Sequence, residues 1–167
     1  MHYYSKVKTA AGRFWIACSQ AGITMISLAD DSPESFEAAY KKRFGLRPQP
    51  GGIQKSYARA VQDAAAGREL EPVPIDLSEL TEFQKKILNT LRLVPRGEVR
   101  TYKELASMAG RPKAIRAVGN TMAHNPIPIL IPCHRVVPST GGIGNYGLGV
   151  QMKRKILALE GVHVEKL

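Results

Sequence analysis

The sequence predicts an α+β protein with two parts, a small α/β domain over residues 1–77 and a mostly helical domain over residues 78–167. Two observations support this prediction. Before residue 78, short segments rich in β-branched and aromatic residues alternate with glycine-containing turns. After residue 78, apolar residues recur at the three- and four-residue spacing of amphipathic helices. A chain of 167 residues can bury the core of one or two such domains.

Three segments at the amino terminus predict a meander of strands. They cover residues 3–7, 13–18 and 22–28, and turns at 10–12 and 20–22 separate them. The segments hold no group of polar residues that demands chemistry. We therefore interpret the first domain as a scaffold.

Two helices and an extended connection should complete the first domain. Ser32 can cap a helix that starts at Pro33 and ends at Gly45, because proline suits the first helical position and glycine the residue after the last. A second apolar stripe at helical spacing precedes Gly67. Residues 70–77 contain two prolines, which favour an extended connection or an edge strand.

Two capping boxes predict helix starts in the second domain. Thr81 is followed three residues later by Gln84, and Thr101 by Glu104. The first box opens a helix that a Pro-Arg-Gly sequence breaks. The second opens a helix over residues 102–109.

A turn and a further helix then predict a helix-turn-helix. Gly110-Arg111 forms the turn, and Pro112 starts a helix over residues 112–122. In this arrangement the second helix enters a DNA groove. The charge agrees, because 24 Lys and Arg against 14 Asp and Glu give a net charge of +10. Such an excess favours a polyanionic partner, although many basic proteins bind no nucleic acid.

The second helix of the pair is unlike a reader of base sequence. Its residues are mainly small, among them Ala114, Ala117, Gly119 and Thr121, with Arg116 as the one long polar side chain. Sequence-specific readers need several Arg, Asn or Gln side chains for base edges. A smooth helix could press into a groove while Arg116 fills the space of a displaced base. Equally, the small residues could pack on a neighbour while Arg116 pairs with an acid.

Cys133 is followed directly by His134, in an apolar segment stiffened by prolines. A thiol of ordinary pKa is mostly protonated at neutral pH, so a reactive cysteine needs a neighbouring base. Adjacent residues of an extended segment point to opposite faces, so a turn or a water molecule would have to connect the two. Taken alone, the pair is better explained by a small core cysteine, because reactive thiols are rare.

The two cysteines, Cys18 and Cys133, make no disulfide framework, and no Cys/His cluster has zinc-like spacing. We therefore expect no metal and no cofactor. A needed free thiol fits a reducing compartment, the cytoplasm or, in a eukaryote, the nucleus. The sequence shows no membrane-length apolar run and no signal-peptide pattern, so we expect no membrane partner.

A glycine-rich loop over residues 138–149 follows the cysteine, and its backbone can approach a ligand closely. It lacks the pattern of a phosphate-binding loop. A last helix should run from about Val150 to Glu160. The Lys-Arg-Lys run at 153–155 is interpreted as its solvated face.

Four ordered motifs over residues 80–162 resemble the O6-alkylguanine-DNA alkyltransferase family. They are the Tyr102…Arg-Ala-Val-Gly helix pair, the Asn125-Pro-x-Pro start, the Ile-Pro-Cys-His-Arg-Val centre and the Gly-Asn-Tyr loop, with Glu160-Gly161 trailing. The resemblance implies a ribonuclease H-like first domain and a winged helix-turn-helix second domain. It also implies direct repair, in which Cys133 irreversibly takes the alkyl group of O6-alkylguanine and, less well, that of O4-alkylthymine.

The family's roles transfer to matching residues here. Besides Cys133, the catalytic residues would be His134 as base, Glu160 as the group that orients it, and Tyr102 as proton donor to the guanine. The base would be flipped out through the minor groove of double-stranded DNA by a monomeric protein. The DNA-binding residues would be Arg116, Ala114, Ala117, Thr121 and Arg135, and the base pocket would comprise Asn125, Val136, Ser139, Tyr146, Gly147 and Gly149. Pro138 would narrow that pocket.

Three other classes of protein are weighed against repair. A non-catalytic damage binder of the same family would lack the cysteine. A sequence-specific regulator would need base-reading side chains that the second helix does not have. A cysteine hydrolase would need an open oxyanion site and no DNA-binding helices. Direct repair accounts for the most features.

Overall fold

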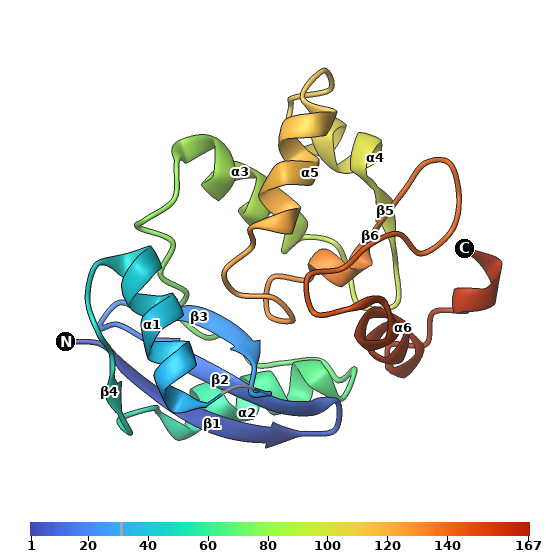
Figure 1. The fold of residues 1–167 in the computed structure, drawn as a ribbon. Coiled ribbons are helices and arrows are strands. Elements are labelled where there is room, and N and C mark those ends of the chain that lie inside the picture. Colours follow the sequence, from blue (N-terminus) through green and yellow to red (C-terminus); the bar gives the residue numbers. More distant parts are fainter. Residues whose placement is uncertain (31) are drawn as a thin grey trace.

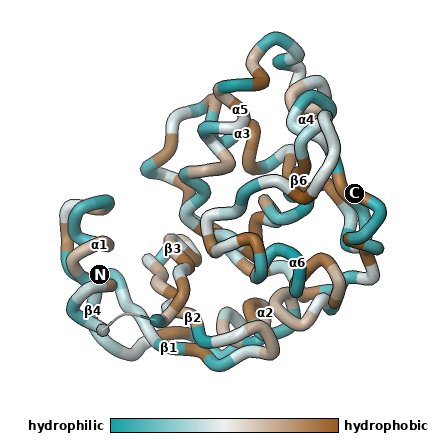
Figure 2. Tube along the Cα trace, turned by 45° about the vertical axis from the view of Figure 1, so that its right-hand side comes forward, coloured by the Kyte–Doolittle hydropathy of each residue, from teal (hydrophilic) through white to brown (hydrophobic). Residues whose placement is uncertain are grey.

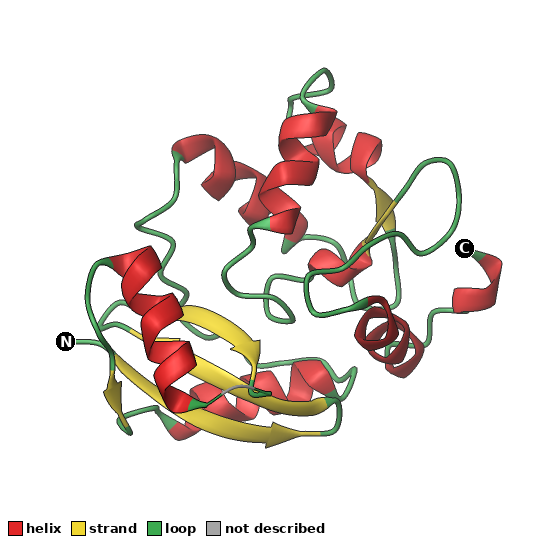
Figure 3. Ribbon diagram, viewed as in Figure 1, coloured by secondary structure: helices red, strands yellow, loops and turns green. Residues whose placement is uncertain are grey.

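The structure is a computed structural model that describes residues 1–30 and 32–167, and it is a mixed α/β fold (Figure 1). A four-stranded sheet forms its amino-terminal part, in the order β3-β2-β1-β4 (Figure 3). The first three strands pair antiparallel as predicted, and the fourth pairs parallel to β1. Their bounds are β1 (Tyr3–Thr9), β2 (Gly12–Cys18), β3 (Ile23–Leu28) and β4 (Gln49–Pro50).

Two helices cover opposite faces of this sheet, α1 (Pro33–Phe44) and α2 (Lys55–Ala65). Successive side chains of a strand point to opposite faces of the sheet, and β2 shows both faces. Trp15 packs with Phe36 of α1, whereas Phe14 belongs to the cluster that contains Tyr57 of α2. The predicted start of α1 is confirmed. The Ser32 side chain accepts a hydrogen bond from the Ser35 backbone nitrogen at 3.3 Å.

The carboxy-terminal part is built from helices around a two-stranded parallel pair. Both predicted capping boxes are present, at Thr81 and at Thr101. The elements are α3 (Glu82–Leu91), β5 (Arg100–Thr101), α4 (Tyr102–Met108), α5 (Ile115–Ala123), the 3₁₀ turn η1 (Cys133–Arg135), β6 (Val136–Val137), α6 (Val150–Leu159) and the 3₁₀ turn η2 (Val164–Lys166). None of the helices in the described ranges is long and apolar enough to cross a membrane.

One apolar core joins the two parts. It contains residues of β2 and α2 together with Ile87, Leu105 and Ile131 from the carboxy-terminal part. Figure 2 shows hydrophobic stretches alternating with hydrophilic ones along the strands and helices, as amphipathic elements require. The carboxy-terminal helices therefore pack directly on the amino-terminal sheet.

Hydrogen bonds also connect the sheet to the segment that leads to Cys133. The Ile26 nitrogen on the edge strand β3 donates to the Pro126 carbonyl at 2.9 Å. An Arg43 terminal nitrogen of α1 donates to the His124 carbonyl at 3.3 Å. The amino-terminal part thus fixes the backbone on both sides of Asn125.

The structure corrects two local predictions. Helix α5 begins at Ile115 rather than Pro112, because residues before it form a turn in which the Ala114 nitrogen donates to the Arg111 carbonyl. Arg116 therefore lies in the first turn of α5, not in its middle. Residues 133–135 form a 3₁₀ turn, one of the two connections between Cys133 and His134 that the sequence left open. Lys153, expected on a solvated face, is fully buried.

Candidate active site

Cys133 is held by a rigid stretch of backbone. Prolines occupy positions 126, 128 and 132, and Ile129 between them has φ 76°. A positive φ is costly for a β-branched residue, so the surrounding packing must hold it in place. The Cys133 nitrogen then donates to the Ile131 carbonyl at 2.8 Å, which tightens the turn that carries the thiol.

The thiol lies at a cavity of about 260 Å³ that opens beside α5. Cys133 is 9% exposed. The cavity is lined by Tyr102, Gly119, Met122, Ala123, Cys133, Asn145, Tyr146 and Gly147. Gly119, Met122 and Ala123 of α5 and part of the glycine-rich loop thus face the same space as the thiol.

A side-chain amide contacts the sulfur directly. Asn125 Nδ2 donates to Cys133 Sγ at 3.2 Å and to the Ile131 carbonyl at 2.9 Å. Burial raises the pKa of the Cys133 thiol, whereas the Asn125 hydrogen bond and the nearby Lys153 charge lower it. Both opposing groups stabilise a negative sulfur. Burial outweighs both groups, so the pKa of the Cys133 thiol is raised overall and loss of its proton needs a base.

His134 is completely buried and is oriented by Glu160. His134 Nε2 lies 2.8 Å from Glu160 Oε1, while His134 Nδ1 is buried and has no hydrogen-bond partner among residues 1–30 and 32–167. Burial lowers the pKa of His134, and Glu160 opposes that shift. A neutral imidazole whose Nε2 donates to Glu160 leaves Nδ1 free to accept a proton. The ring is thus arranged as a base whose far nitrogen is held by a carboxylate.

Arg135 holds the other side of the same carboxylate. Its Nε and Nη2 donate to Glu160 at 3.0 and 2.8 Å, and its Nη1 donates to the Val94 carbonyl at 2.7 Å. Burial alone would raise the pKa of Glu160, but the hydrogen bonds from His134 and Arg135 lower it to about 2. Glu160 therefore stays ionised at neutral pH.

Lys153 is a member of the site that the sequence interpretation missed. Its Nζ donates to the Val136 carbonyl at 2.7 Å and to the Asn145 carbonyl at 3.3 Å, so it connects β6 to the glycine-rich loop. Burial lowers the pKa of Lys153 to about 8. The sequence did contain a signal, because positions 153, 156, 157 and 160 share one face of a helix. Lys153 and Glu160 thus belong to the inward stripe of α6.

Tyr102 stands on the opposite wall, at the start of α4. It is half-buried, and burial, with the negative charge of a Cys133 thiolate adding to it, raises the pKa of its hydroxyl. A Cβ at Gly119 would lie 3.9 Å from the Tyr102 ring, so the two helices meet closely at this point. The phenol remains protonated at neutral pH, as a proton donor must.

The remaining predicted DNA-binding residues divide into two groups. Arg116 and Ala117 are exposed and, with Ala114, line an open hollow on the outer face of α5. Thr121 is buried, and its hydroxyl donates to the Ala117 carbonyl at 2.9 Å. Arg135 has a side chain only 13% exposed and bonded to Glu160. The geometry thus removes Thr121 and Arg135 from the DNA-facing surface, because their polar groups are already used inside the protein.

The predicted pocket residues also lie in different places. Tyr146 and Gly147 line the cavity beside Cys133, and Ser139 lines a neighbouring hollow with Pro138 and Tyr102. Asn125 and Val136 lie behind the thiol instead: Asn125 bonds the sulfur, and buried Val136 receives Lys153. Gly149 precedes α6 and lines neither space. Across residues 1–30 and 32–167, no three His, Cys, Asp or Glu residues form a group that could hold a metal ion.

Comparison with known proteins identifies the family. The family model "6-O-methylguanine DNA methyltransferase, DNA binding domain" matches residues 82–162. The methylated-DNA–protein-cysteine methyltransferase of Mycolicibacterium paratuberculosis is 34% identical over 163 residues, which cover 96% of this chain and 93% of that protein. The chain belongs to the methylated-DNA–protein-cysteine methyltransferase family. The human member is 52% identical over 85 residues, covering 50% of this chain and 41% of its own length.

Solved structures of family members have the same overall fold. The Mycobacterium tuberculosis O6-methylguanine methyltransferase matches with a TM-score of 0.80 at 30% identity, over 100% of this chain and 95% of that chain. The Mycobacterium tuberculosis protein in complex with DNA matches with a TM-score of 0.77 at 32% identity, over 95% and 92% of the two chains. The mixed α/β fold described above is therefore the fold of this family.

Proposed function

We propose that this protein repairs DNA directly, by moving the alkyl group of O6-alkylguanine onto Cys133 and keeping it there. The observation that carries the proposal is the buried thiol at a cavity, with His134, Glu160 and Asn125 arranged around it. The methyltransferase names of the relatives and the DNA complex of one of them support the same reaction.

The chemistry follows from the groups present. Cys133 loses its proton to His134, and the thiolate attacks the alkyl carbon in line with the carbon–oxygen bond. A carbon–sulfur bond forms, the bond to guanine O6 breaks, and the electron pair goes to the guanine, which Tyr102 protonates. The proton that His134 took from Cys133 returns to the Tyr102 oxygen through solvent. The product thioether is stable, so each chain reacts once.

Access to the alkyl carbon requires the base to leave the duplex, which costs a few kcal/mol. Arg116 stands exposed in the first turn of α5, where it can occupy the vacated space. Ala117 and half-buried Ala114 give the same face a smooth surface suited to a minor groove. The cavity beside Cys133 receives the flipped base, with Tyr146 and Gly147 on its wall. O4-alkylthymine is the poorer substrate of the same cavity.

The division of the chain is part of the same proposal. Residues 1–77 serve as a ribonuclease H-like scaffold domain, and residues 78–167 as a winged helix-turn-helix domain that holds the site. The protein acts as a monomer, in the cytoplasm or in a nucleus. Two hydrogen bonds from residues 1–77, to the carbonyls of Pro126 and His124, support the scaffold role, since they hold the backbone around Asn125.

The reaction is tested by counting guanine formed against protein added. A duplex with one O6-methylguanine is mixed with increasing amounts of protein, digested to nucleosides and separated by chromatography. We expect deoxyguanosine to rise linearly, with a limit of one per chain. Tight lesion binding without any deoxyguanosine would indicate a non-catalytic damage binder. Absence of both deoxyguanosine and lesion preference would favour a sequence-specific DNA-binding regulator.

A second test addresses base extrusion. Arg116→Ala should slow transfer in fully paired duplex by tenfold or more, at about 1.4 kcal/mol per factor of ten, and should slow it least in single strands, where no base is extruded. Equal losses on both substrates would mean that Arg116 does not fill the gap. Lys155→Ala, which removes an exposed charge from α6, is the matched control.

A further inference from the structure

Two glycines from distant parts of the chain approach the backbone around Glu160. Gly67 belongs to the turn after α2, and Gly97 belongs to the loop after α3. Their φ angles are +70° and +83°, in the left-handed region. Glu160 follows the last residue of α6, and its carboxylate bonds to His134. The residue that orients the base is therefore in contact with both parts of the protein.

The approach of Gly67 leaves no room for a side chain. A Cβ at position 67 would lie 2.8 Å from the Glu160 nitrogen and closer still to the Leu159 carbonyl group. Ordinary contacts of a Cβ begin at 3.4 Å. The obstructing atoms are backbone and cannot rotate away, so the peptide before Glu160 would have to move by more than half an ångström. Glycine at position 67 thus permits the observed place of this peptide.

Gly97 approaches the carbonyl of Glu160. A Cβ at position 97 would lie 3.2 Å from the carbonyl oxygen. A neighbour at this distance must give by a few tenths of an ångström. The contact at Gly97 is looser than the contact at Gly67, so an added methyl group should have a smaller effect at position 97 than at position 67.

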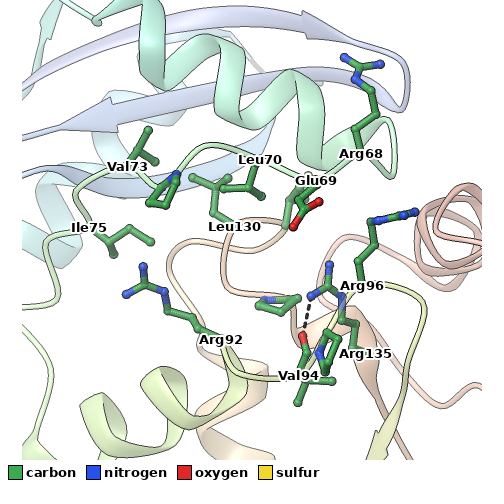
Figure 4. A pocket seen from close by; sticks show the side chains of 14 residues that line it. Arg68, Glu69, Leu70, Val73, Ile75, Arg92, Val94, Arg96, Leu130 and Arg135 are labelled. Atoms are coloured by element: carbon green, nitrogen blue, oxygen red, sulfur yellow. Dashed lines mark hydrogen bonds between the residues drawn. The ribbon is translucent and has the colours of Figure 1, made fainter.

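Hydrogen bonds hold the two approaching segments together and to Glu160. Arg96 Nη1 donates to the Gly67 carbonyl at 3.0 Å, which ties the loop after α3 to the turn after α2. Arg135 donates to the Val94 carbonyl at 2.7 Å and to the Glu160 carboxylate at 2.8 Å, which ties the same loop to the site. Figure 4 shows the bond between Arg135 and Val94, and Arg96 reaching from the same loop toward the turn after α2.

We propose that Gly67 and Gly97 are positioning residues for methyl transfer, because the lack of side chains there lets the backbone stand where the Glu160 carboxylate reaches His134. The inference rests on the proposed function, since His134 is the base of that reaction. A misplacement of about 1 Å by a substitution far from the chemistry can slow a reaction about a hundredfold. The turn after α2 thus gives residues 1–77 a part in the reaction besides their scaffold role.

Three Gly→Ala variants of the full chain separate the contact from backbone strain. Gly67→Ala and Gly97→Ala test the two contacts. Gly45→Ala is the matched control, because Gly45 at the end of α1 has φ +73° and no atom of the described residues within 4 Å of an added Cβ. All three variants bear the cost of a left-handed alanine, but only the first two press on Glu160.

The first readout is single-turnover methyl transfer at saturating duplex, per folded chain. We expect Gly67→Ala to be slower than the wild type by about tenfold to a hundredfold, and Gly97→Ala by less than about tenfold. Gly45→Ala should react as the wild type does.

The second readout is the proton NMR signal of the His134 Nε2–H, which a loss of stability alone would not move. An N–H bonded to a carboxylate resonates far downfield, and Glu160→Gln identifies the signal by shifting it. We expect a large shift in Gly67→Ala, a smaller one in Gly97→Ala and none in Gly45→Ala.

Slower transfer together with a shifted His134 signal, in the order of the two contacts, supports the proposal. Equal transfer by folded Gly67→Ala and Gly45→Ala, or slower transfer with an unchanged signal, would overturn it. If Gly67→Ala does not fold, Gly97→Ala against Gly45→Ala decides by the same two readouts. A wild type that transfers nothing would overturn the proposed function and this proposal with it, and it is recognised before any variant is compared.

Discussion

Two buried clusters of this protein are built on opposite principles. The aromatic cluster, Tyr4, Trp15, Phe36 and Tyr40, lies between the sheet and α1. Its rings meet at centroid distances of 5.3 to 6.1 Å. The polar cluster, Cys133, His134, Lys153 and Glu160, is as deeply buried but contains a carboxylate and an amine.

This difference in composition indicates which of the two clusters serves function rather than stability. Packed aromatic rings stabilise a fold through burial and ring contacts alone. Burying charges costs free energy, and apolar replacements of similar volume are often more stable. The polar cluster therefore needs a reason other than stability, and the thiol in its middle supplies one. Variants of the two clusters should accordingly affect different measurements.

The largest effect is expected from Cys133→Ala, which should abolish methyl transfer. Cys133 is the one thiol among the described residues that line the cavity, and removal of its sulfur leaves the exposed face of α5 unchanged. Transfer is measured by loss of O6-methylguanine from a duplex, and DNA affinity by fluorescence anisotropy. Cys18→Ala, the matched loss of a buried thiol in the sheet, should keep transfer. Retained transfer in Cys133→Ala would contradict the assignment.

Glu160→Gln should slow transfer by about two to four orders of magnitude, the usual contribution of a base whose orientation is lost. The substitution should also remove a pH-dependent contribution to the free energy of unfolding. The pKa of Glu160 is about 2 in the folded protein against 4.5 as the ordinary value, so its stabilisation is present above pH 4.5 and is lost as the pH falls toward 2. Urea unfolding at several pH values measures this. Glu165→Gln, an exposed substitution, should change neither quantity.

Phe36→Ala should act on the other cluster, and on stability only. Truncation of a buried phenylalanine costs about 3–5 kcal/mol of unfolding free energy. The rate of transfer by the folded fraction should stay that of the wild type, because no aromatic residue of this cluster lines the cavity beside Cys133. Chemical denaturation and single-turnover transfer on the same sample give both values. A slower transfer rate in fully folded Phe36→Ala would contradict the claim that the aromatic cluster affects stability alone.

Lys153→Met should give the smallest of the expected effects, a change in the way stability depends on pH in alkali. The pKa of Lys153 is about 8 folded against 10.5 ordinarily, so between these values the unfolded chain holds the proton and the folded chain does not. Stability contributed by Lys153 therefore rises from pH 8 to 10.5. The unfolding free energy of the wild type minus that of the variant should become more positive over this interval. Lys155→Met, exposed on the same helix, should give no such difference.

Local signals made most of the fold predictable from the sequence. Capping boxes at Thr81 and Thr101 and the proline after Ser32 act within one turn, so the structure reproduces them. The start of α5 was misplaced because Pro112 suits a turn as well as a first helical position. The adjacency of Cys133 and His134 marked them as candidates, but the roles predicted for them came from the resemblance of four motifs to a known family.

The rest of the site depends on contacts between distant residues. Arg135 was assigned to DNA as part of the family resemblance, and the sequence does not reveal its carboxylate partner, 25 residues away. Lys153 was assigned to solvent because of its charge, although its spacing from Glu160 placed both on one face of α6. The sulfur contact of Asn125 requires the tertiary fold, since the edge strand β3 positions that segment.

The central claim is that Cys133 itself receives the alkyl group. Peptide mass spectrometry after reaction with a duplex carrying one O6-methylguanine tests it most directly, with Cys18 as the internal control. The account predicts a gain of one methylene on the peptide with Cys133, saturating at one per chain, and an unmodified Cys18 peptide. A methyl group on Cys18, or a repaired duplex with both cysteines unmodified, would contradict it.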